Sequence, residues 1–328
     1  MRSPRMWHRL LGSIILVLIS MPALAEKAPP VPEGYPNETA VKAAMALQLI
    51  EIVDVERPIP ETIEEIKDIV YGRGGNRALH LDLYLPKQRE TPSPAIIFIH
   101  GGAWQGGQRS DMRFYCIEFA QQGYVTATIT YRLSGDAPFP AAVRDAKCAI
   151  RWLRAHAEEY DVDPSRIAVS GNSAGGHLSM MAGFAQDPEL EGEGGRRQTS
   201  SEVCGVVNFY GPTDLTTSFA REQSAVIQFM GGKPYHDAKE TYRQASPLMH
   251  LDERDPPTLT FHGTIDSTVP IAQADRLDKR MQELGLDHTY ERYEGWPHTM
   301  DLAKPVNKRC VYIMKQFFAR IFSNQNIN

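Results

Sequence analysis

Five short and nearly continuous apolar runs constrain the fold of this chain more than any other feature of its sequence. They read "PAIIFIHGG", "YVTATITYRL", "RIAVSGNS", "GVVNFYGP" and "PTLTFHGT". Such runs are typical of parallel strands that are buried on both faces of a sheet. Stretches with helical spacing lie between and after them, near residues 113–122, 141–156, 176–185, 272–284 and 305–321. This alternation predicts an α/β fold with a mostly parallel central sheet and helices on both faces.

The segments before the first of these runs follow other patterns. "IEEIKDIVYG" and "ALHLDLYLP" alternate apolar and polar residues, which predicts antiparallel strands at one edge of the sheet. A proline-rich lead-in over residues 29–36 precedes a short amphipathic helix predicted over residues 37–50. We therefore expect a lead-in over residues 26–62 and one domain over residues 63–328, with no internal repeat and no second core.

Two inserts interrupt the alternation of strands and helices. Residues 187–202, "DPELEGEGGRRQTSSE", are charged and rich in glycine, which predicts a mobile surface loop. Residues 214–255 form a longer connection than a crossover needs and contain the apolar stretch "SAVIQFMGG". This second insert is predicted to be a small helical cap over the strand ends, with an ordinary long connection as the alternative.

The N-terminus has the pattern of a secretory signal peptide. Three arginines precede an apolar run over residues 10–19, and the small residues "ALA" follow at 23–25. A membrane anchor would need roughly 20 apolar residues, and Pro22 ends this run early. Glu26 stands where a lipid-anchored protein would carry cysteine. We therefore expect cleavage after Ala25, no stable membrane anchor, and a periplasmic or secreted protein.

The charge of the mature chain argues against two classes of partner. Removal of residues 1–25 takes away three arginines and no acidic residue, so the net charge of −5 becomes −5 − 3 = −8. An acidic chain without a basic stripe is not typical of proteins that bind nucleic acid or anionic membranes.

Four cysteines remain after the signal peptide. Cys116, Cys148, Cys204 and Cys310 are too widely spaced for a zinc knuckle. Export would permit disulfides, and buried free thiols are the equal alternative.

The stretch "RIAVSGNSAGGHLSMMAGF" joins a predicted strand to a predicted helix through small residues. In the pattern Gly-X-Ser-X-Gly the serine sits on a sharp, strained turn, and its small neighbours let the adjacent elements approach. Ser173 occupies that position between Gly171 and Gly175. The hydroxyl then lies beside the first amides of a helix, whose positive end favours developing negative charge. Ser173 is the predicted nucleophile, and it requires a base from elsewhere in the chain.

The predicted base and its acidic partner follow later strands. "PTLTFHGTIDSTVP" presents Asp266 in a turn, and "YERYEGWPHTMD" presents His298. The chain order serine, aspartate, histidine is the one expected for this architecture. His298 would take the proton of Ser173 and return it to the leaving group, while Asp266 would fix the imidazole tautomer.

Three other residues near these motifs are given structural roles. Asp301 is a rival acid, but its place three residues after His298 predicts a capping or surface group. His262 and His177 are expected to be hydrogen-bonded structural residues.

The motif "FIHGGAW" follows the first buried parallel strand, beside the predicted turn at Ser173. Its small residues allow backbone N–H groups to turn inward, so the amides of Gly102, Ala103 and Ala174 are predicted to form an oxyanion hole. His100 is expected to support the loop rather than to react.

Two aromatic residues beside these motifs are candidates for the substrate pocket. Trp104 follows the predicted oxyanion loop, and Tyr210 ends the strand next to Ser173. Both are predicted to line the acyl side of the pocket. Burial of Trp104 in the core, where it would only brace the loop, is the alternative.

The ordered motifs "HGGAW", "GNSAGG", "YGPTD" and "HGTIDSTVP" resemble those of the α/β-hydrolase carboxylesterases of the hormone-sensitive-lipase and acetyl-esterase type. The resemblance covers roughly residues 63–322 and implies the same triad and the same oxyanion donors. Two positions depart from the family pattern: Ala103 replaces the third glycine of His-Gly-Gly-Gly, and Pro297 replaces the glycine before the histidine.

These motifs predict an exported serine hydrolase that cleaves short-acyl esters of small molecules or polysaccharides through an acyl-enzyme. The mechanism needs no metal and no other cofactor. A peptidase or amidase on the same fold is the alternative, and a non-catalytic binding module is a third reading. Retention of every triad and oxyanion position argues against the binding module.

Overall fold

The structure is a computed structural model that describes residues 27–192, 194 and 196–323. Its centre is an eight-stranded sheet with the strand order β1-β2-β4-β3-β5-β6-β7-β8. The strands are β1 (Ile63–Gly74), β2 (Arg77–Pro86), β3 (Ser93–Ile99), β4 (Val125–Ile129), β5 (Val162–Asn172), β6 (Val206–Phe209), β7 (Thr258–Gly263) and β8 (His288–Tyr293).

The pairing of the strands confirms the predicted sheet. β1 pairs with β2 and β2 with β4 in antiparallel fashion, whereas every pair from β4 through β8 is parallel. The strands β4, β6 and β7 are buried along their whole length, as their continuous apolar sequences require. Each parallel strand therefore delivers its carboxyl end to one edge of the sheet.

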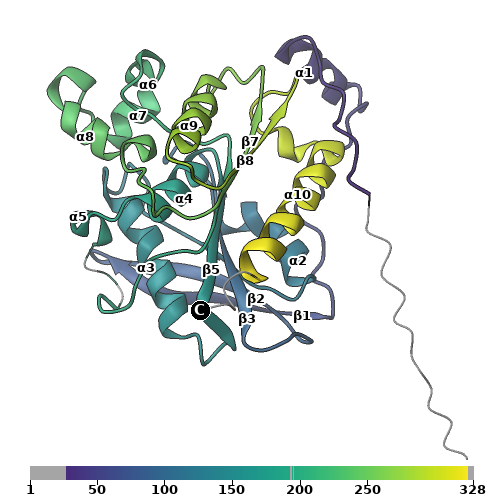
Figure 1. The fold of residues 1–328 in the computed structure, drawn as a ribbon, viewed down its shortest axis with the longest axis vertical. Coiled ribbons are helices and arrows are strands. Elements are labelled where there is room, and N and C mark those ends of the chain that lie inside the picture. Colours follow the sequence, from purple (N-terminus) through teal and green to yellow (C-terminus); the bar gives the residue numbers. More distant parts are fainter. Residues whose placement is uncertain (1–26, 193, 195, 324–328) are drawn as a thin grey trace, which may run out of the picture.

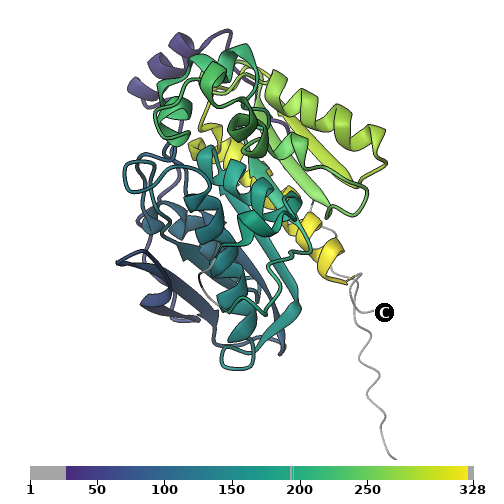
Figure 2. The same cartoon turned by 90° about the vertical axis from the view of Figure 1, so that its left-hand side faces the viewer.

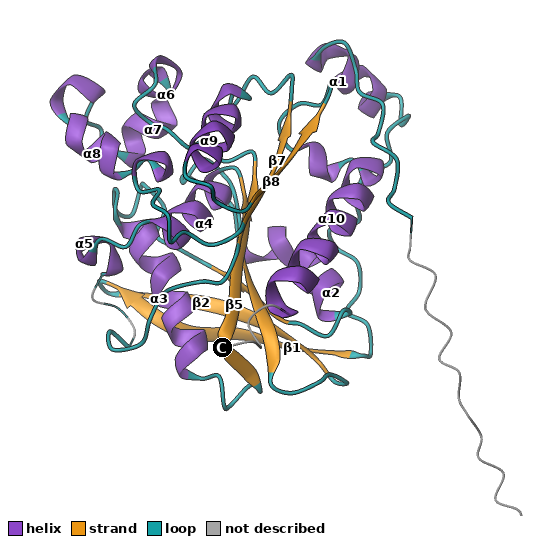
Figure 3. Cartoon of the chain, viewed as in Figure 1, coloured by secondary structure: helices purple, strands orange, loops and turns teal. Residues whose placement is uncertain are grey.

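Helices cover both faces of the sheet (Figure 1, Figure 3). One face packs against α2 (Arg113–Ala120) and α10 (Lys304–Ser323), and the other packs against α3 (Ala141–Ala155), α4 (Ala174–Phe184) and α9 (Ala272–Glu283). Alternate residues of β3 separate into the two resulting cores, because Ile97 belongs to one and Phe98 to the other. This is the α/β-hydrolase arrangement that the sequence predicts.

The insert over residues 214–255 folds into short helices. They are α6 (Ser218–Glu222), α7 (Ser224–Phe229) and α8 (Lys239–Gln244), with single 3₁₀ turns at Tyr235–Asp237 and Pro247–Met249. Figures 1 and 2 place these helices at the same end of the molecule as α1 (Glu38–Ala46).

Helix α1 is shorter than the predicted span of residues 37–50. It begins after Asn37, whose side-chain oxygen accepts a hydrogen bond from the amide of Ala40. It ends before Leu47, where the backbone leaves the helical conformation. Leu47 and Leu49 are then exposed rather than packed.

The predicted mobile loop over residues 187–202 is partly wrong, because its first turn is anchored. Helix α5 (Pro188–Glu191) buries Leu190, and Glu191 forms ion pairs of 2.6 Å with the buried side chains of Lys147 and Arg151. Arg144 also donates to the carbonyl of Glu189 at 2.8 Å. The carboxylate of Glu191 balances the charge of these two buried cations on α3. The spacing of residues in the sequence does not indicate this pairing.

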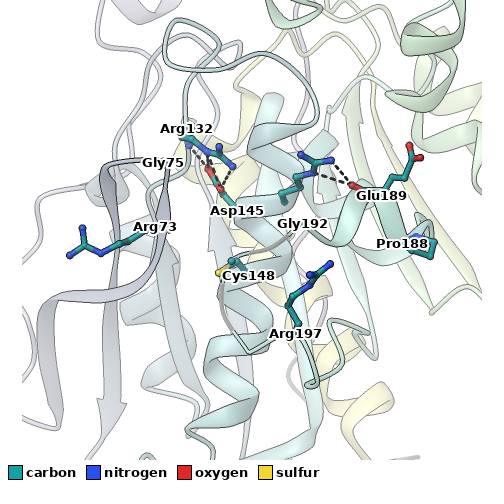
Figure 4. Close-up of a pocket in the computed structure, with 11 residues that line it drawn as sticks. Arg73, Gly75, Arg132, Asp145, Cys148, Pro188, Glu189, Gly192 and Arg197 are labelled. Atoms are coloured by element: carbon teal, nitrogen blue, oxygen red, sulfur yellow. Dashed lines mark hydrogen bonds and ion pairs between the residues drawn. The ribbon is translucent and has the colours of Figure 1, made fainter.

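The anchored turn borders a cavity of about 380 Å³ that also contacts β1 and α3. Four arginines line it, and Arg132 is held by both oxygens of Asp145. Figure 4 shows Arg73 pointing away from the other guanidinium groups. The lining therefore does not converge on a single anion.

All four cysteines are free thiols, which decides between the two alternatives left open by their spacing. Cys116, Cys148 and Cys310 are buried, and Cys204 is half-buried. Among the described residues, no helix combines the length and apolarity needed to cross a membrane. The predicted signal peptide over residues 1–25 lies outside the described residues.

Candidate active site

Ser173 lies on the sharp turn between β5 and α4. Its φ of +52° and ψ of −119° form a conformation that residues other than glycine rarely adopt. A Cβ atom on Gly171 would lie 2.4 Å from the carbonyl carbon of Gly175, and one on Gly175 would lie 2.0 Å from the carbonyl oxygen of Ile99. A larger residue at either position would push β5, α4 and β3 apart.

The structure brings Ser173, His298 and Asp266 into one hydrogen-bonded chain. The Nε2 atom of His298 lies 3.0 Å from the Oγ atom of Ser173, and its Nδ1 atom lies 2.6 Å from Oδ2 of Asp266. A proton on Nδ1 is held by the carboxylate, which leaves Nε2 as the acceptor for the serine hydroxyl. This geometry permits proton transfer from serine to histidine.

Asp266 is held in its charged form. Burial alone would raise its pKa, but hydrogen bonds from His262, His298 and the amide of Val269 lower the pKa of Asp266 to about 2. Its Oδ1 atom accepts from the amides of Thr268 at 2.9 Å and Val269 at 2.8 Å. His262 lies 3.3 Å from Oδ2 through its Nε2 atom, which also lies 2.8 Å from the carbonyl of Val269.

The loops that carry Asp266 and His298 follow β7 and β8 and pack closely on each other. A Cβ atom on Gly263, the last residue of β7, would lie 2.0 Å from the carbonyl oxygen of Trp296. The hydroxyl of Thr264 accepts from the amide of Gly295 at 2.9 Å. These contacts fix the distance between the acid loop and the histidine loop.

The predicted oxyanion loop lies directly against the turn at Ser173. A Cβ atom on Gly101 would come within 3.3 Å of the Cβ atom of Ser173. Three consecutive residues then have positive φ angles: 105° at Gly102, 53° at Ala103 and 57° at Trp104. Within the part of the chain that the structure describes, the amides of Gly102 and Ala103 donate to no protein acceptor.

Ala174 adds a third amide, because as the first residue of α4 it has no intrahelical acceptor for its N–H group. His100 supports the loop. Its ring is buried and stacks on Tyr131 with 4.4 Å between ring centroids. Its Nδ1 atom lies 2.8 Å from the carbonyl oxygen of Gly101.

Trp104 is buried behind the predicted oxyanion loop. Its ring stacks on Phe229 of α7 with 4.4 Å between centroids, and its N–H group donates to Nδ1 of His177 at 3.3 Å. His177 lies 2.7 Å through Nε2 from the carbonyl of Ala245. Burial lowers the pKa of His177 to about 4, although the hydrogen bond to Ala245 acts in the opposite direction. The loop, α4 and the segment 214–255 are thus joined through one neutral histidine.

Asp301 is not the capping or surface group that the sequence predicts. It is buried, and its two carboxylate oxygens accept hydrogen bonds from the hydroxyls of Tyr210 and Tyr115. Asn307 donates to the Tyr115 hydroxyl at 3.2 Å and to the Asp301 carbonyl at 3.0 Å. The sequence could not reveal this cluster, because Tyr115 and Asp301 stand 186 positions apart.

The N-terminal segment, which we define as residues 29–53, reaches the same loops. Glu38 of α1 accepts from the hydroxyl of Ser267 at 2.6 Å and from its amide at 3.1 Å, directly beside Asp266. The Tyr35 amide donates to the carbonyl of Gly295 at 2.9 Å. The sequence predicts only a lead-in with a short helix here, since apolar spacing indicates a helix but not what the helix contacts.

No group of three histidine, cysteine, aspartate or glutamate side chains is arranged to hold a metal ion among the described residues. The site that the structure assembles consists of a hydroxyl, an imidazole, a carboxylate and backbone amides.

Comparisons with known proteins agree with the α/β-hydrolase fold. The BD-FAE family profile matches residues 81–281. The esterase LipC of Mycobacterium tuberculosis is 31% identical over 284 residues, which span 81% of this chain and 70% of LipC.

Two solved structures are similar in fold. A truncated carbohydrate esterase from gut microbiota superposes with a TM-score of 0.71 at 28% identity, covering 80% of this chain and 98% of the other. A propionate-bound esterase of the planctomycete Thermogutta terrifontis superposes with a TM-score of 0.67 at 28% identity, covering 82% and 97% of the two chains.

Proposed function

The chain belongs to the BD-FAE family of α/β-hydrolases and is a carboxylic ester hydrolase, and from that premise we propose that Ser173, His298 and Asp266 cleave a short-acyl ester through an acyl-enzyme. The observation that carries this proposal is the continuous chain of contacts from Ser173 Oγ through the His298 ring to Asp266.

In the first half of the reaction, the Ser173 oxygen attacks the ester carbonyl carbon while Nε2 of His298 takes the hydroxyl proton. The carbonyl oxygen becomes an oxyanion that the amides of Gly102, Ala103 and Ala174 stabilise. Each such donor is typically worth about 3 kcal/mol in the transition state. The bond to the alcohol then breaks, and His298 returns the proton to the departing alkoxide.

In the second half, His298 takes a proton from water, and the hydroxide attacks the acyl carbon. The bond to Ser173 breaks, His298 returns the proton to the serine oxygen, and the carboxylic acid leaves. Asp266 keeps its negative charge throughout, because hydrogen bonds hold its pKa at about 2.

The proposed substrates are short-acyl esters of small molecules or polysaccharides. Two relatives support this choice, one described as a carbohydrate esterase and one solved with propionate bound. We further propose that the buried indole of Trp104 occupies space that a long acyl chain would need.

We also propose that the chain is exported and cleaved after Ala25, on the basis of its N-terminal pattern. Expression of the full-length chain in a bacterial host, followed by fractionation and N-terminal sequencing, tests this. A periplasmic or secreted product that begins at Glu26 is expected, and an uncleaved cytoplasmic product would contradict it.

A fluorophosphonate probe and two substrate panels test the catalytic proposal. The probe should label the wild-type protein and leave Ser173→Ala unlabelled. A panel of p-nitrophenyl esters, compared with aminoacyl anilides at equal enzyme concentration, separates esterase from peptidase activity. Turnover of the anilides at rates equal to the esters would favour an amidase instead.

A further inference from the structure

A second buried carboxylate is separated from the imidazole of His298 by a single side chain. Asp301 follows His298 by three residues, yet it points into the core, with 2% of its surface exposed. Nothing in the acyl-transfer chemistry above uses it. A buried carboxylate is costly unless it is fully hydrogen-bonded, so its contacts indicate what it does there.

Tyr210 connects Asp301 to His298. Its hydroxyl donates to Oδ1 of Asp301, and its ring packs on the imidazole with 4.5 Å between centroids and 60° between planes. The Tyr210 backbone is fixed as well, because its amide donates to the carbonyl of Phe261 at 2.8 Å. Its φ of +42° is rarely adopted by residues other than glycine.

The hydrogen bonds are those that an ionised Asp301 would accept. Both carboxylate oxygens accept from tyrosine hydroxyls, Oδ1 from Tyr210 and Oδ2 from Tyr115, and a protonated acid would have to donate one of these bonds. Burial raises the pKa of Asp301 above its ordinary value, and the two hydroxyls and a charged His298 offset part of that rise. Opposite charges attract, so an ionised Asp301 stabilises the imidazolium that forms when His298 takes the serine proton.

We propose that Asp301 is a positioning residue for the acyl-transfer reaction, which holds the face of His298 through Tyr210 and adds a second negative charge that stabilises the imidazolium in the transition state. The inference rests on the proposed triad. It assigns Tyr210 to the support of His298 rather than to the substrate pocket.

Other groups also act on His298 and must be held constant. Asp266 faces the imidazole from the loop after β7, and Ser173 faces it from the turn before α4. His262 of β7 and Glu38 of α1 act indirectly, since each contacts the Asp266 loop. None of these four is altered in the variants of Asp301, Tyr210 and Asp145 below.

Two variants separate the charge from the packing. Asp301→Asn keeps the size and removes the charge, so kcat should fall roughly tenfold, the scale of one charge acting across one side chain in a protein interior. KM should stay within about twofold, because His298 contributes little to ground-state binding. The acidic limb of the kcat/KM profile should move to lower pH, since an imidazolium without this charge forms less readily.

Tyr210→Phe keeps the ring and the charge but removes the hydroxyl that links them. Its kcat should fall by a smaller factor of roughly three to five, and the acidic limb should not move to lower pH. If Asp301→Asn does not fold, the kcat of Tyr210→Phe decides the inference alone: a value equal to wild type would overturn it.

Asp145→Asn is the matched control, because it makes the same change at a buried carboxylate that pairs with Arg132 beneath the other face of the sheet. It should lower the unfolding temperature and leave kcat and the pH profile unchanged. The inference is overturned if folded Asp301→Asn matches wild type in both, or if Asp145→Asn reproduces its losses.

Ser173→Ala sets the background rate in these assays. Wild-type activity no higher than this background would mean that the proposed function fails. Wild-type activity far above it, with Asp301→Asn equal to wild type at every pH, would mean that this inference alone fails.

Discussion

At the scale of single residues, Ser173 combines a reactive position with a strained backbone. Replacement of Ser173 by alanine removes the proposed nucleophile and retains a Cβ atom at the φ of +52°. The kcat for p-nitrophenyl acetate should fall by at least roughly 10⁴-fold, because the remaining contacts position an ester without attacking it. Circular dichroism should show an unchanged fold. Near-normal turnover by the folded variant would remove Ser173 from the mechanism.

We predict that Trp104 limits the room beside the proposed oxyanion loop. The wild-type enzyme should have its highest kcat/KM between acetyl and butyryl esters. Trp104→Ala should move this maximum to longer chains, because the removed indole leaves space between the loop and Phe229. Each additional buried methylene can then raise kcat/KM by roughly fourfold. A series of p-nitrophenyl esters from acetate to decanoate measures the shift.

Trp104→Phe is the control for this series, since it retains an aromatic ring against Phe229 and should keep the preference for short acyl groups. Deletion of a buried indole costs about 3–5 kcal/mol of stability, so the rates should be compared well below the unfolding temperature of each variant. A wild-type maximum at decanoate would contradict both the short-acyl proposal and the role of Trp104.

At the scale of elements, the sequence predicts those features that neighbouring residues determine on their own. The apolar run of β5, the small residues around Ser173 and the helical spacing of α4 are adjacent in sequence, so their strand, turn and helix followed directly. The strand ends that carry Asp266 and His298 followed from the rule that parallel strands share an edge. The burial of Asp301 did not, because its partners Tyr115 and Tyr210 come from distant elements.

The same limit applies to the N-terminal segment. Its proline content indicated a lead-in, yet it contacts both loops of the candidate triad. Pro32 accepts from the indole N–H of Trp296 at 3.3 Å, and the amide of Val53 donates to the carbonyl of Leu302 at 2.9 Å. Trp296 and Leu302, the partners in these contacts, flank His298 in the sequence. Helical periodicity contains no information on such docking.

We therefore predict that α1 supports catalysis from outside the matched family region. Glu38→Ala removes the acceptor for both Ser267 hydrogen bonds and frees the turn that follows Asp266. kcat should fall roughly three- to tenfold with KM unchanged, since small displacements of catalytic groups reduce rate more than binding. Lys42→Ala removes an exposed ion pair with Glu38 at 3.8 Å but leaves the Ser267 hydrogen bonds in place, so it should behave as wild type. Equal rates for Glu38→Ala and Lys42→Ala would show that the contact is only structural.

At the scale of the whole molecule, three segments of the chain meet at His177. It joins α4, the oxyanion loop and the segment 214–255 through its two ring nitrogens. The ring must stay neutral to accept from Trp104. Burial lowers its pKa from 6.5 to about 4 in the folded protein, so between these values the unfolded chain binds a proton that the folded chain does not. The contribution of His177 to the free energy of unfolding is therefore fully present above pH 6.5 and falls as the pH drops toward 4.

Asp255 acts in the opposite direction. Burial raises its pKa from 3.8 to about 7, so the folded chain binds a proton more readily than the unfolded chain between those values, and this group adds stability as the pH falls. The total pH dependence of unfolding is a sum of opposing parts. Single variants isolate each part, because every other group is common to variant and wild type.

The difference in unfolding free energy between wild type and His177→Gln should therefore shrink as the pH falls from 7.5 to 4.5, measured by urea denaturation. The whole lowering of the His177 pKa corresponds to about 3 kcal/mol of unfolding free energy. Most of this difference should appear between pH 7.5 and 4.5. Asp255→Asn should show the reverse trend, with its advantage over wild type greatest above pH 7. A constant difference for His177→Gln across the interval would mean that His177 titrates alike in the folded and unfolded chains, and that a neutral imidazole does not join the three segments.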